Sequence, residues 1–226
     1  MYLDNIEEFA KSNKMKINNN KTKVMKFTRA TSFDFPLEVS LSDKVNLEIV
    51  KNIKLLGIVI SDKLKWNENT DYFCDKARRK IWLIRNMKLS GLTENQLLHA
   101  YKKEVRSLLE LAVPVWSSGL TIEQIDQIER VQKLALSAIL GHSYESYERA
   151  LVKTKLDRLS TRRDKLCTKF IRKNLKSDRP LFQVKNKTHA TRSNQNLLEE
   201  IHCRTQAFFD SGLPYLTRLW NKNIKS

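Results

Sequence analysis

The chain has 226 residues, of which 42 are Lys or Arg and 25 are Asp or Glu, so its formal net charge is +17. Its five glycines lie far apart. This argues against a dinucleotide-binding fold and a P-loop, because both need clustered glycines to bind phosphate. Glycine and proline are also too scarce for a many-stranded sandwich or barrel, so the composition favours long helices.

The cysteines and histidines indicate neither disulfides nor a metal site. The three cysteines form an odd, widely spaced set without a C-x-x-C pair, and the four histidines lack the spacing of zinc ligands. The amino terminus is acidic where a signal peptide is basic, and no apolar run is long enough to span a membrane. We therefore expect an intracellular protein, in the cytoplasm or nucleus, that is not secreted and has no metal site and no membrane partner.

Residues 1–66 predict a small antiparallel β-meander with one helix. The helix is expected over residues 3–14, where apolar and acidic side chains separate onto opposite faces. Four short strands follow, and the last one is apolar on both faces, as in a buried strand. Their expected ranges are Thr22–Phe27, Leu37–Leu41, Val45–Val50 and Lys54–Ile60.

Residues 67–141 predict a bundle of three helices, because the apolar residues now recur at helical spacing. The second and third helices each begin with a capping box, in which a Thr and a Gln three residues later exchange hydrogen bonds. The expected limits are Phe73 and Gly91, Thr93 and Pro114, and Thr121 and Gly141. Trp66, Trp82 and Trp116 are expected to be core aromatics rather than surfaces on which bases stack.

Residues 142–226 form a basic region with 19 basic and 8 acidic side chains. A helix expected from Ser160 to Pro180 places six bases within an arc of about 100°. These six bases, the basic stripe, are Arg162, Lys165, Lys169, Arg172, Lys173 and Lys176. A last helix is expected from Leu197 to Phe209, followed by a tail. Because like charges on one helix face repel, the stripe favours contact with a polyanion over a merely solvated face.

No active site is visible in the sequence. Ser117-Ser118-Gly119 lacks the context of a nucleophile elbow, and no pair of carboxylates is placed to hold two Mg²⁺ ions. Binding to a phosphate backbone, with little sequence selectivity and strong salt dependence, is therefore the function that the residues favour.

Four segments in this order resemble the carboxy-terminal part of a non-LTR retrotransposon reverse transcriptase of the jockey-like LINE type. They are KMKINNNKTKVMKF (Lys16 to Phe27), KLLGIVISDKLKW (Lys54 to Trp66), LELAVPVWSSGLTIEQIDQIERVQKLALSAILG (Leu109 to Gly141) and SGLPYLTRLWN (Ser211 to Asn221). The resemblance implies that Lys21 and Thr22 match motif D of the palm, where Lys21 could assist the leaving pyrophosphate. It also implies that Leu55, Leu56 and Gly57 match the primer grip, and that residues 72–141 match the thumb.

One departure from this family is decisive for activity. The polymerases hold two Mg²⁺ ions on palm carboxylates that include an Asp-Asp pair, and no such pair occurs in this chain. The resemblance thus implies a truncated copy, with the fingers and most of the palm upstream of Met1, that does not polymerise alone. Mg²⁺ is implied only for the complete polymerase, and this chain has no catalytic residue beyond the possible accessory Lys21.

The expected fold class is α+β, with a palm-edge remnant (1–66), a helical thumb-like bundle (67–141) and a basic helical region (142–226). The expected partner is an RNA–DNA hybrid or duplex, contacted through its backbone. The candidate phosphate contacts are Arg78, Arg79, Lys80 and the basic stripe. Two alternatives stay open: a repurposed RNA- or DNA-binding module without catalysis, and an inert degenerate fragment.

Overall fold

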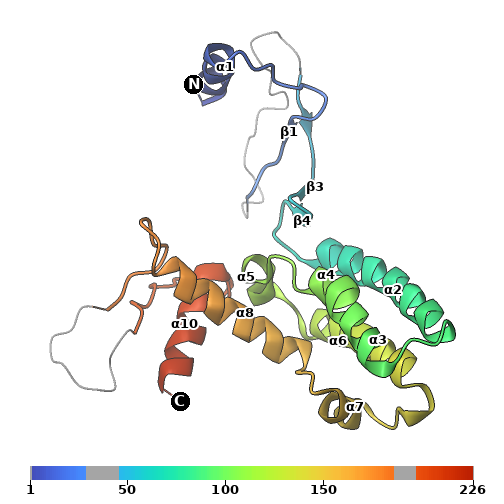
Figure 1. The fold of residues 1–226 in the computed structure, drawn as a ribbon. Helices are drawn as coiled ribbons and strands as arrows, with labels where there is room; N and C mark the ends of the chain where they lie inside the picture. The colour runs from blue at the N-terminus through green and yellow to red at the C-terminus, as the bar shows by residue number, and fades with distance from the viewer. Residues whose placement is uncertain (1, 29–45, 186–196, 226) are drawn as a thin grey trace. The chain divides into compact units, whose positions relative to one another are not determined.

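The computed structural model describes residues 2–28, 46–185 and 197–225 (Figure 1). The chain divides into two compact units, Met1–Glu68 and Asn69–Ser226. Helices and small sheets are both present, as an α+β protein requires. The strands are β1 (Lys23–Val24), β2 (Glu48–Ile49), β3 (Asn52–Leu55) and β4 (Ile58–Ser61). The helices are α1 (Tyr2–Ser12), α2 (Asn67–Leu89), α3 (Glu94–Ala100), the π-helix η1 (Tyr101–Arg106), α4 (Ser107–Leu109), α5 (Val113–Trp116), η2 (Ser117–Gly119), α6 (Ile122–Leu140), η3 (Gly141–Ser143), α7 (Tyr147–Thr154), α8 (Leu159–Asn174), α9 (Gln206–Phe209) and α10 (Gly212–Lys225).

The described residues of the first unit do not form the antiparallel meander that the sequence predicted. Its strands form two separate pairs among the described residues, and β1 pairs with β2 in parallel. A parallel pair needs a long connection, which the 23 residues between these strands supply. The expected strand Leu37–Leu41 lies outside the described residues. The expected helix is confirmed as α1.

The prediction of one buried strand over Lys54–Ile60 is wrong. The chain reverses there, and β3 pairs with β4 as an antiparallel hairpin in which Leu55 faces Ile58. The two turn residues, Leu56 and Gly57, have φ of 49° and 90°, as a two-residue hairpin turn requires. The apolar run is therefore the two arms of a hairpin, and Leu56 at its tip is 90% exposed.

The predicted starts of the second and third helices of the other unit are confirmed. At each start, the Thr backbone N–H donates to the Gln side chain at 2.9 Å, and the Gln backbone N–H donates back to the Thr hydroxyl. The residues concerned are Thr93 with Gln96 and Thr121 with Gln124. Gly141 ends α6 as expected, and there Lys88 donates hydrogen bonds to the carbonyls of Ala138 and Ile139 at 3.1 and 2.8 Å.

The second predicted helix ends earlier than expected and contains a π-helical segment. It runs as α3, η1 and α4 and stops at Leu109, and Ala112 then takes a left-handed conformation with φ of 48°. Pro114 stands in the first turn of α5 instead of ending a helix. A proline is tolerated there, since its missing N–H would have no partner within the helix.

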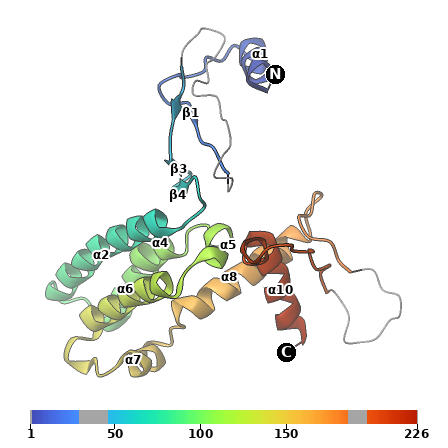
Figure 2. The ribbon, with the colours of Figure 1, turned by 180° about the vertical axis from the view of Figure 1, so that it is seen from behind.

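The carboxy-terminal helices differ most from the prediction. Helix α7, capped by Ser146, was not predicted. The helix predicted over Leu197–Phe209 is confirmed only at its end, as α9. Its beginning is wrong, because Leu198 lies in an extended bridge to Val184, and the Asn221 side chain bonds both the N–H and the C=O of Leu198 at 2.8 and 3.0 Å. The segment expected as a tail forms α10. Two views show α8 lying beside α5 and α10 (Figures 1 and 2).

The core of the second unit is built on the aromatic rings of α2 and α5. Trp116 is 1% exposed, its ring centroid lies 6.0 Å from that of Phe73, and its indole N–H donates to the Leu111 carbonyl at 2.7 Å. Trp116 and Trp66 are buried as predicted, but the prediction for Trp82 is wrong, since its side chain is 65% exposed. Within the described ranges, no helix has the length and apolar character of a membrane span.

Candidate nucleic-acid interface

The exposed face of α8 carries the basic side chains that the sequence singled out. Lys169, Arg172 and Lys173 are exposed, and within the described part of the chain they form no ion pair and no side-chain hydrogen bond. The opposite face of α8 is buried through Leu159, Cys167 and Ile171. Burial of one face thus fixes which side of the helix the three bases occupy.

Two members of the basic stripe instead form ion pairs with acidic side chains of the same unit. The guanidinium of Arg162 makes two hydrogen bonds of 2.9 Å to the carboxylate of Glu110, and this pairing raises the pKa of Arg162. The ammonium of Lys165 donates to Asp157 at 2.6 Å, which lowers the pKa of Asp157. Both partners lie outside α8, Glu110 by about 50 residues and Asp157 just before the helix, so the pattern of α8 alone could not reveal them.

Lys176 lies beyond the helix that was expected to hold it. Helix α8 ends at Asn174, well before Pro180, and the Asn174 side chain accepts a hydrogen bond from the Leu181 N–H at 2.7 Å. Lys176 is exposed in the turn that follows. Among the described residues, the unpaired bases of the stripe are therefore three on α8 and one just after it. Below, we call Lys169, Arg172, Lys173 and Lys176 the α8 cluster.

A network of buried polar side chains holds the start of α8 against α6. The carboxylate of Glu129 accepts hydrogen bonds from the Tyr147 hydroxyl and from the Ser160 N–H, the latter at 2.8 Å. Gln132, which is fully buried, accepts from the Tyr101 hydroxyl and donates to the Tyr147 hydroxyl at 2.8 Å. Burial raises the pKa of both tyrosines, so both stay protonated donors. The orientation of α8 is thus set by specific bonds as well as by apolar packing.

The basic triplet on α2 does not act as one patch. Arg78 pairs with Asp75 one turn before it at 2.9 Å, and Lys80 pairs with Glu104 of η1 at 2.9 Å. Arg79 is exposed and has no ion pair within the described ranges. Consecutive residues on a helix point about 100° apart, so the side chains of Arg79 and Lys80 lie on different faces of α2.

Trp82 is the exposed aromatic that sequence reasoning missed. Residues three and four positions away lie beside it on the helix surface, and there they are Arg78, Arg79, Arg85 and Asn86. A signal existed in the sequence, because Trp82 lies outside the series of Phe73, Ala77, Ile81 and Ile84, which recurs at helical spacing and is buried.

The residues that the sequence predicted as a palm edge belong to the first unit. Lys21 is exposed, and its backbone N–H donates to the Asn18 carbonyl and side-chain oxygens at 3.1 and 3.2 Å in a tight turn before β1. The Leu56–Gly57 turn also lies in this unit. Within the described part of the chain, neither position bonds a carboxylate through a hydrogen bond or an ion pair.

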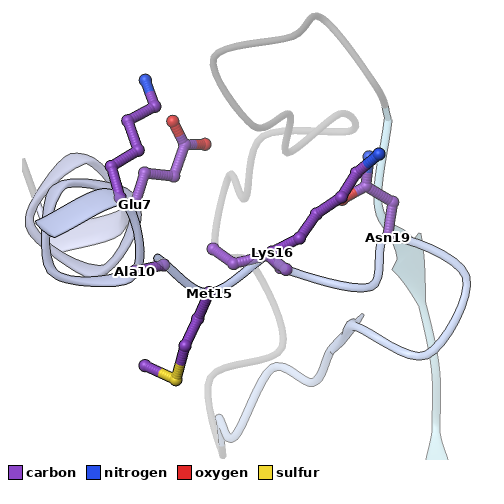
Figure 3. Close-up of a pocket in the computed structure, with 7 residues that line it drawn as sticks. Glu7, Ala10, Met15, Lys16 and Asn19 are labelled. Carbon is purple, nitrogen blue, oxygen red and sulfur yellow. The ribbon is translucent and has the colours of Figure 1, made fainter. Parts of the chain in front are cut away.

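A small pocket in the first unit lies between α1 and the segment that follows it. Figure 3 shows Glu7 and Ala10 coming from α1, and Met15, Lys16 and Asn19 from the segment that follows it. The cavity measures about 140 Å³, and its lining offers no nucleophile paired with a base. No group of three or more potential metal ligands occurs among the residues that the structure describes.

Comparisons of this chain with protein-family models, with curated proteins and with solved structures gave no match.

Proposed function

We propose that this chain binds nucleic acid through the phosphate backbone, as the palm-edge and thumb-like part of a reverse transcriptase of the non-LTR retrotransposon kind. In this role it contributes to RNA-directed DNA synthesis by holding template and primer. It supplies no metal-holding Asp-Asp pair, so the chain by itself binds but does not polymerise.

The single observation that carries the proposal is the α8 cluster. Its four side chains are exposed and lack an acidic partner among the described residues, although other bases of the same unit found one. Like charges one turn apart repel by a few tenths of a kcal/mol per pair, and a phosphate backbone relieves that repulsion. Binding of this kind follows charge and spacing, so it carries little sequence information.

The first unit takes a supporting role in the proposal. Leu56 is exposed at the hairpin tip that it forms with Gly57. Because Gly57 has no side chain, its backbone groups are open to contact with a primer end. Lys21, exposed before β1, is the candidate proton donor to a leaving phosphate oxygen in a complete polymerase.

Binding to a duplex across a range of salt concentrations tests the proposal. Replacing the four bases of the α8 cluster by Gln should weaken binding of an RNA–DNA hybrid at least tenfold at low salt. The slope of log affinity against log salt should fall by about 0.9 for each phosphate that is no longer neutralised, or by about 3 to 4 in total. A matched control replaces by Gln four exposed bases elsewhere in the same unit that have no ion pair within the described residues: Lys102, Lys103, Arg130 and Lys155.

An equal loss of affinity in both variants would mean that overall charge, and not the α8 cluster, binds the polyanion. The paired bases supply a second comparison, because Arg162→Gln should cost stability through Glu110 and change the salt slope little. A primer-extension assay with Mg²⁺ completes the test, and nucleotide incorporation by the isolated chain would overturn the non-catalytic part of the proposal.

A further inference from the structure

The exposed face of α2 combines an aromatic ring with unpaired positive charge. Trp82 is 65% exposed, and no side chain in the described ranges stacks on its ring or bonds its N–H. Burial of an indole ring contributes strongly to binding. Most tryptophan side chains are largely buried, so an indole without a packing partner at the surface is unusual.

The charges around Trp82 are arranged on both sides of the ring along the helix. Arg79 lies one turn before it and Arg85 one turn after it, and neither has an ion pair within the described residues. Their Cα atoms are separated by about 9 Å along the axis, because six residues rise about 1.5 Å each. Arg78, which pairs with Asp75, lies four residues before Trp82, on the same side of the ring as Arg79.

This arrangement matches a single strand better than a duplex or an acidic protein segment. A flat aromatic ring offers a stacking surface to any base, but only to one that is not already enclosed between neighbours in a helix. The arginines on each side complement the phosphates that flank such a base. An acidic peptide would satisfy the arginines but would leave the indole face without a matching flat partner.

We propose that Trp82 stacks with an unpaired base of a single-stranded segment of RNA or DNA, while Arg79 and Arg85 bind the flanking phosphates. This inference rests on the proposed function, since it takes nucleic acid as the ligand. The inference adds a second kind of contact. The α8 cluster binds phosphate charge alone, whereas the exposed face of α2 distinguishes unpaired from paired bases.

Tryptophan fluorescence of the full chain reports on this contact directly. The other three tryptophans, Trp66, Trp116 and Trp220, are at most 7% exposed, so quenching by a ligand is dominated by Trp82. A single-stranded oligonucleotide of about 12 nucleotides, within the range that one single-strand-binding fold covers, should quench the emission. The same sequence as a duplex should quench it much less. Poly-glutamate serves as the polyanion without bases, and equal quenching by it would overturn the inference in favour of an acidic protein ligand.

Affinity measurements on variants complete the test. Trp82→Ala should weaken single-strand binding about tenfold, which is the size expected for loss of one stacked base, and should change duplex binding less than about twofold. Trp82→Phe should restore most of the affinity. Leu89→Ala is the matched control, because Leu89 is 87% exposed on the same helix and has no aromatic ring.

The outcomes separate this inference from the proposed function. If the chain binds duplex through the α8 cluster but Trp82→Ala binds single strands as tightly as the parent, only the stacking contact is refuted. An equal loss of affinity in Trp82→Ala and Leu89→Ala would also refute stacking, since it would show general apolar contact. If neither form of nucleic acid binds in dilute buffer, both proposals fail.

Discussion

The two units of this protein bury their apolar residues to very different extents. In the second unit, side chains from α2, α5, α6, α8 and α10 enclose a shared core in which Trp116, Ile139 and Ile171 are at most 1% exposed. In the first unit, the apolar residues Ile6 and Phe9 of α1 are 55% and 62% exposed, and β1 and β2 are two residues long.

Similar local sequence patterns therefore give different structures when the segments available to pack against them differ. Both units have amphipathic helices, but packing of an apolar face provides most of a helix's stability in a protein. The second unit supplies several helices that cover one another. The first unit has one helix and two small strand pairs among its described residues. These elements are too few to cover the apolar side chains of α1.

Separating the units should produce the largest effect. Residues 67–226, which keep α2 whole, should unfold cooperatively with denaturant when expressed alone, because all the helices that enclose the core of the second unit lie in this part of the chain. Residues 1–66 should show no cooperative transition. Circular dichroism during a urea titration of each fragment measures this. Cooperative unfolding of the shorter fragment would break the contrast between the two units.

Truncating one large side chain in each unit sharpens the same contrast. Trp116→Ala should lower the free energy of unfolding by about 4 kcal/mol, as expected for a cavity left by a buried aromatic. Leu56→Ala, at the exposed hairpin tip, should change it by less than about 0.5 kcal/mol. Denaturant titrations of both variants give the two values, and similar losses of stability would show that the first unit also has a tightly packed core.

The buried polar network makes the second unit dependent on hydrogen bonds as well. Gln132→Leu leaves the Tyr101 hydroxyl and the Asp157 carbonyl without their partner, so we expect the free energy of unfolding to fall by about 3 kcal/mol. Gln127→Leu on the same helix is the control, because Gln127 makes an exposed bond to Asp71. The control should cost less than about 1 kcal/mol, and equal costs would argue against a special role for the network.

The core of the second unit should also be sensitive to alkaline pH. Burial raises the pKa of the Cys74 thiol from 9.0 to about 11, so the folded state holds a proton that the unfolded state has released between those values. The stabilisation is complete below pH 9 and is lost as the pH rises towards 11, with a slope of about 1.4 kcal/mol per pH unit. Cys74→Ala should reduce the slope by that amount in urea titrations across this interval. An unchanged slope would contradict burial of the thiol.

The smallest effect concerns the end of α6. At Gly141 an added Cβ would lie 2.5 Å from Nζ of Lys88, and φ is +58°. Gly141→Ala should therefore cost about 1 kcal/mol, through left-handed strain and displacement of the lysine that caps α6. Gly212→Ala has open space and no positive φ, so thermal unfolding should show little change or a small gain. A neutral Gly141→Ala would show that Lys88 moves without cost.

Prediction of the candidate site from the sequence was limited by the distance of the ion-pair partners. The spacing of the basic stripe placed its members on one helix face, but it could not show that Arg162 is bound by Glu110, 52 residues away. The exposure of Trp82 had a weak signal in the sequence, because this residue lies outside the apolar series of α2 that recurs at helical spacing. Where Leu56 and Gly57 reverse the chain, the usual Asn-Gly or Asp-Gly signal is absent from the sequence.

The amino-acid sequence was enough to predict the features that depend on neighbours within one or two helical turns. The capping boxes at Thr93 and Thr121, the glycine end of α6 and the excess of positive charge all follow from local chemistry. Three features became visible only in the fold: Leu198 is extended and bonded to Asn221, α10 is a helix, and some bases of the stripe have an acidic partner among the described residues. The physical reason is that backbone groups and charges accept whichever partner the fold brings close, and that partner is often far away along the chain.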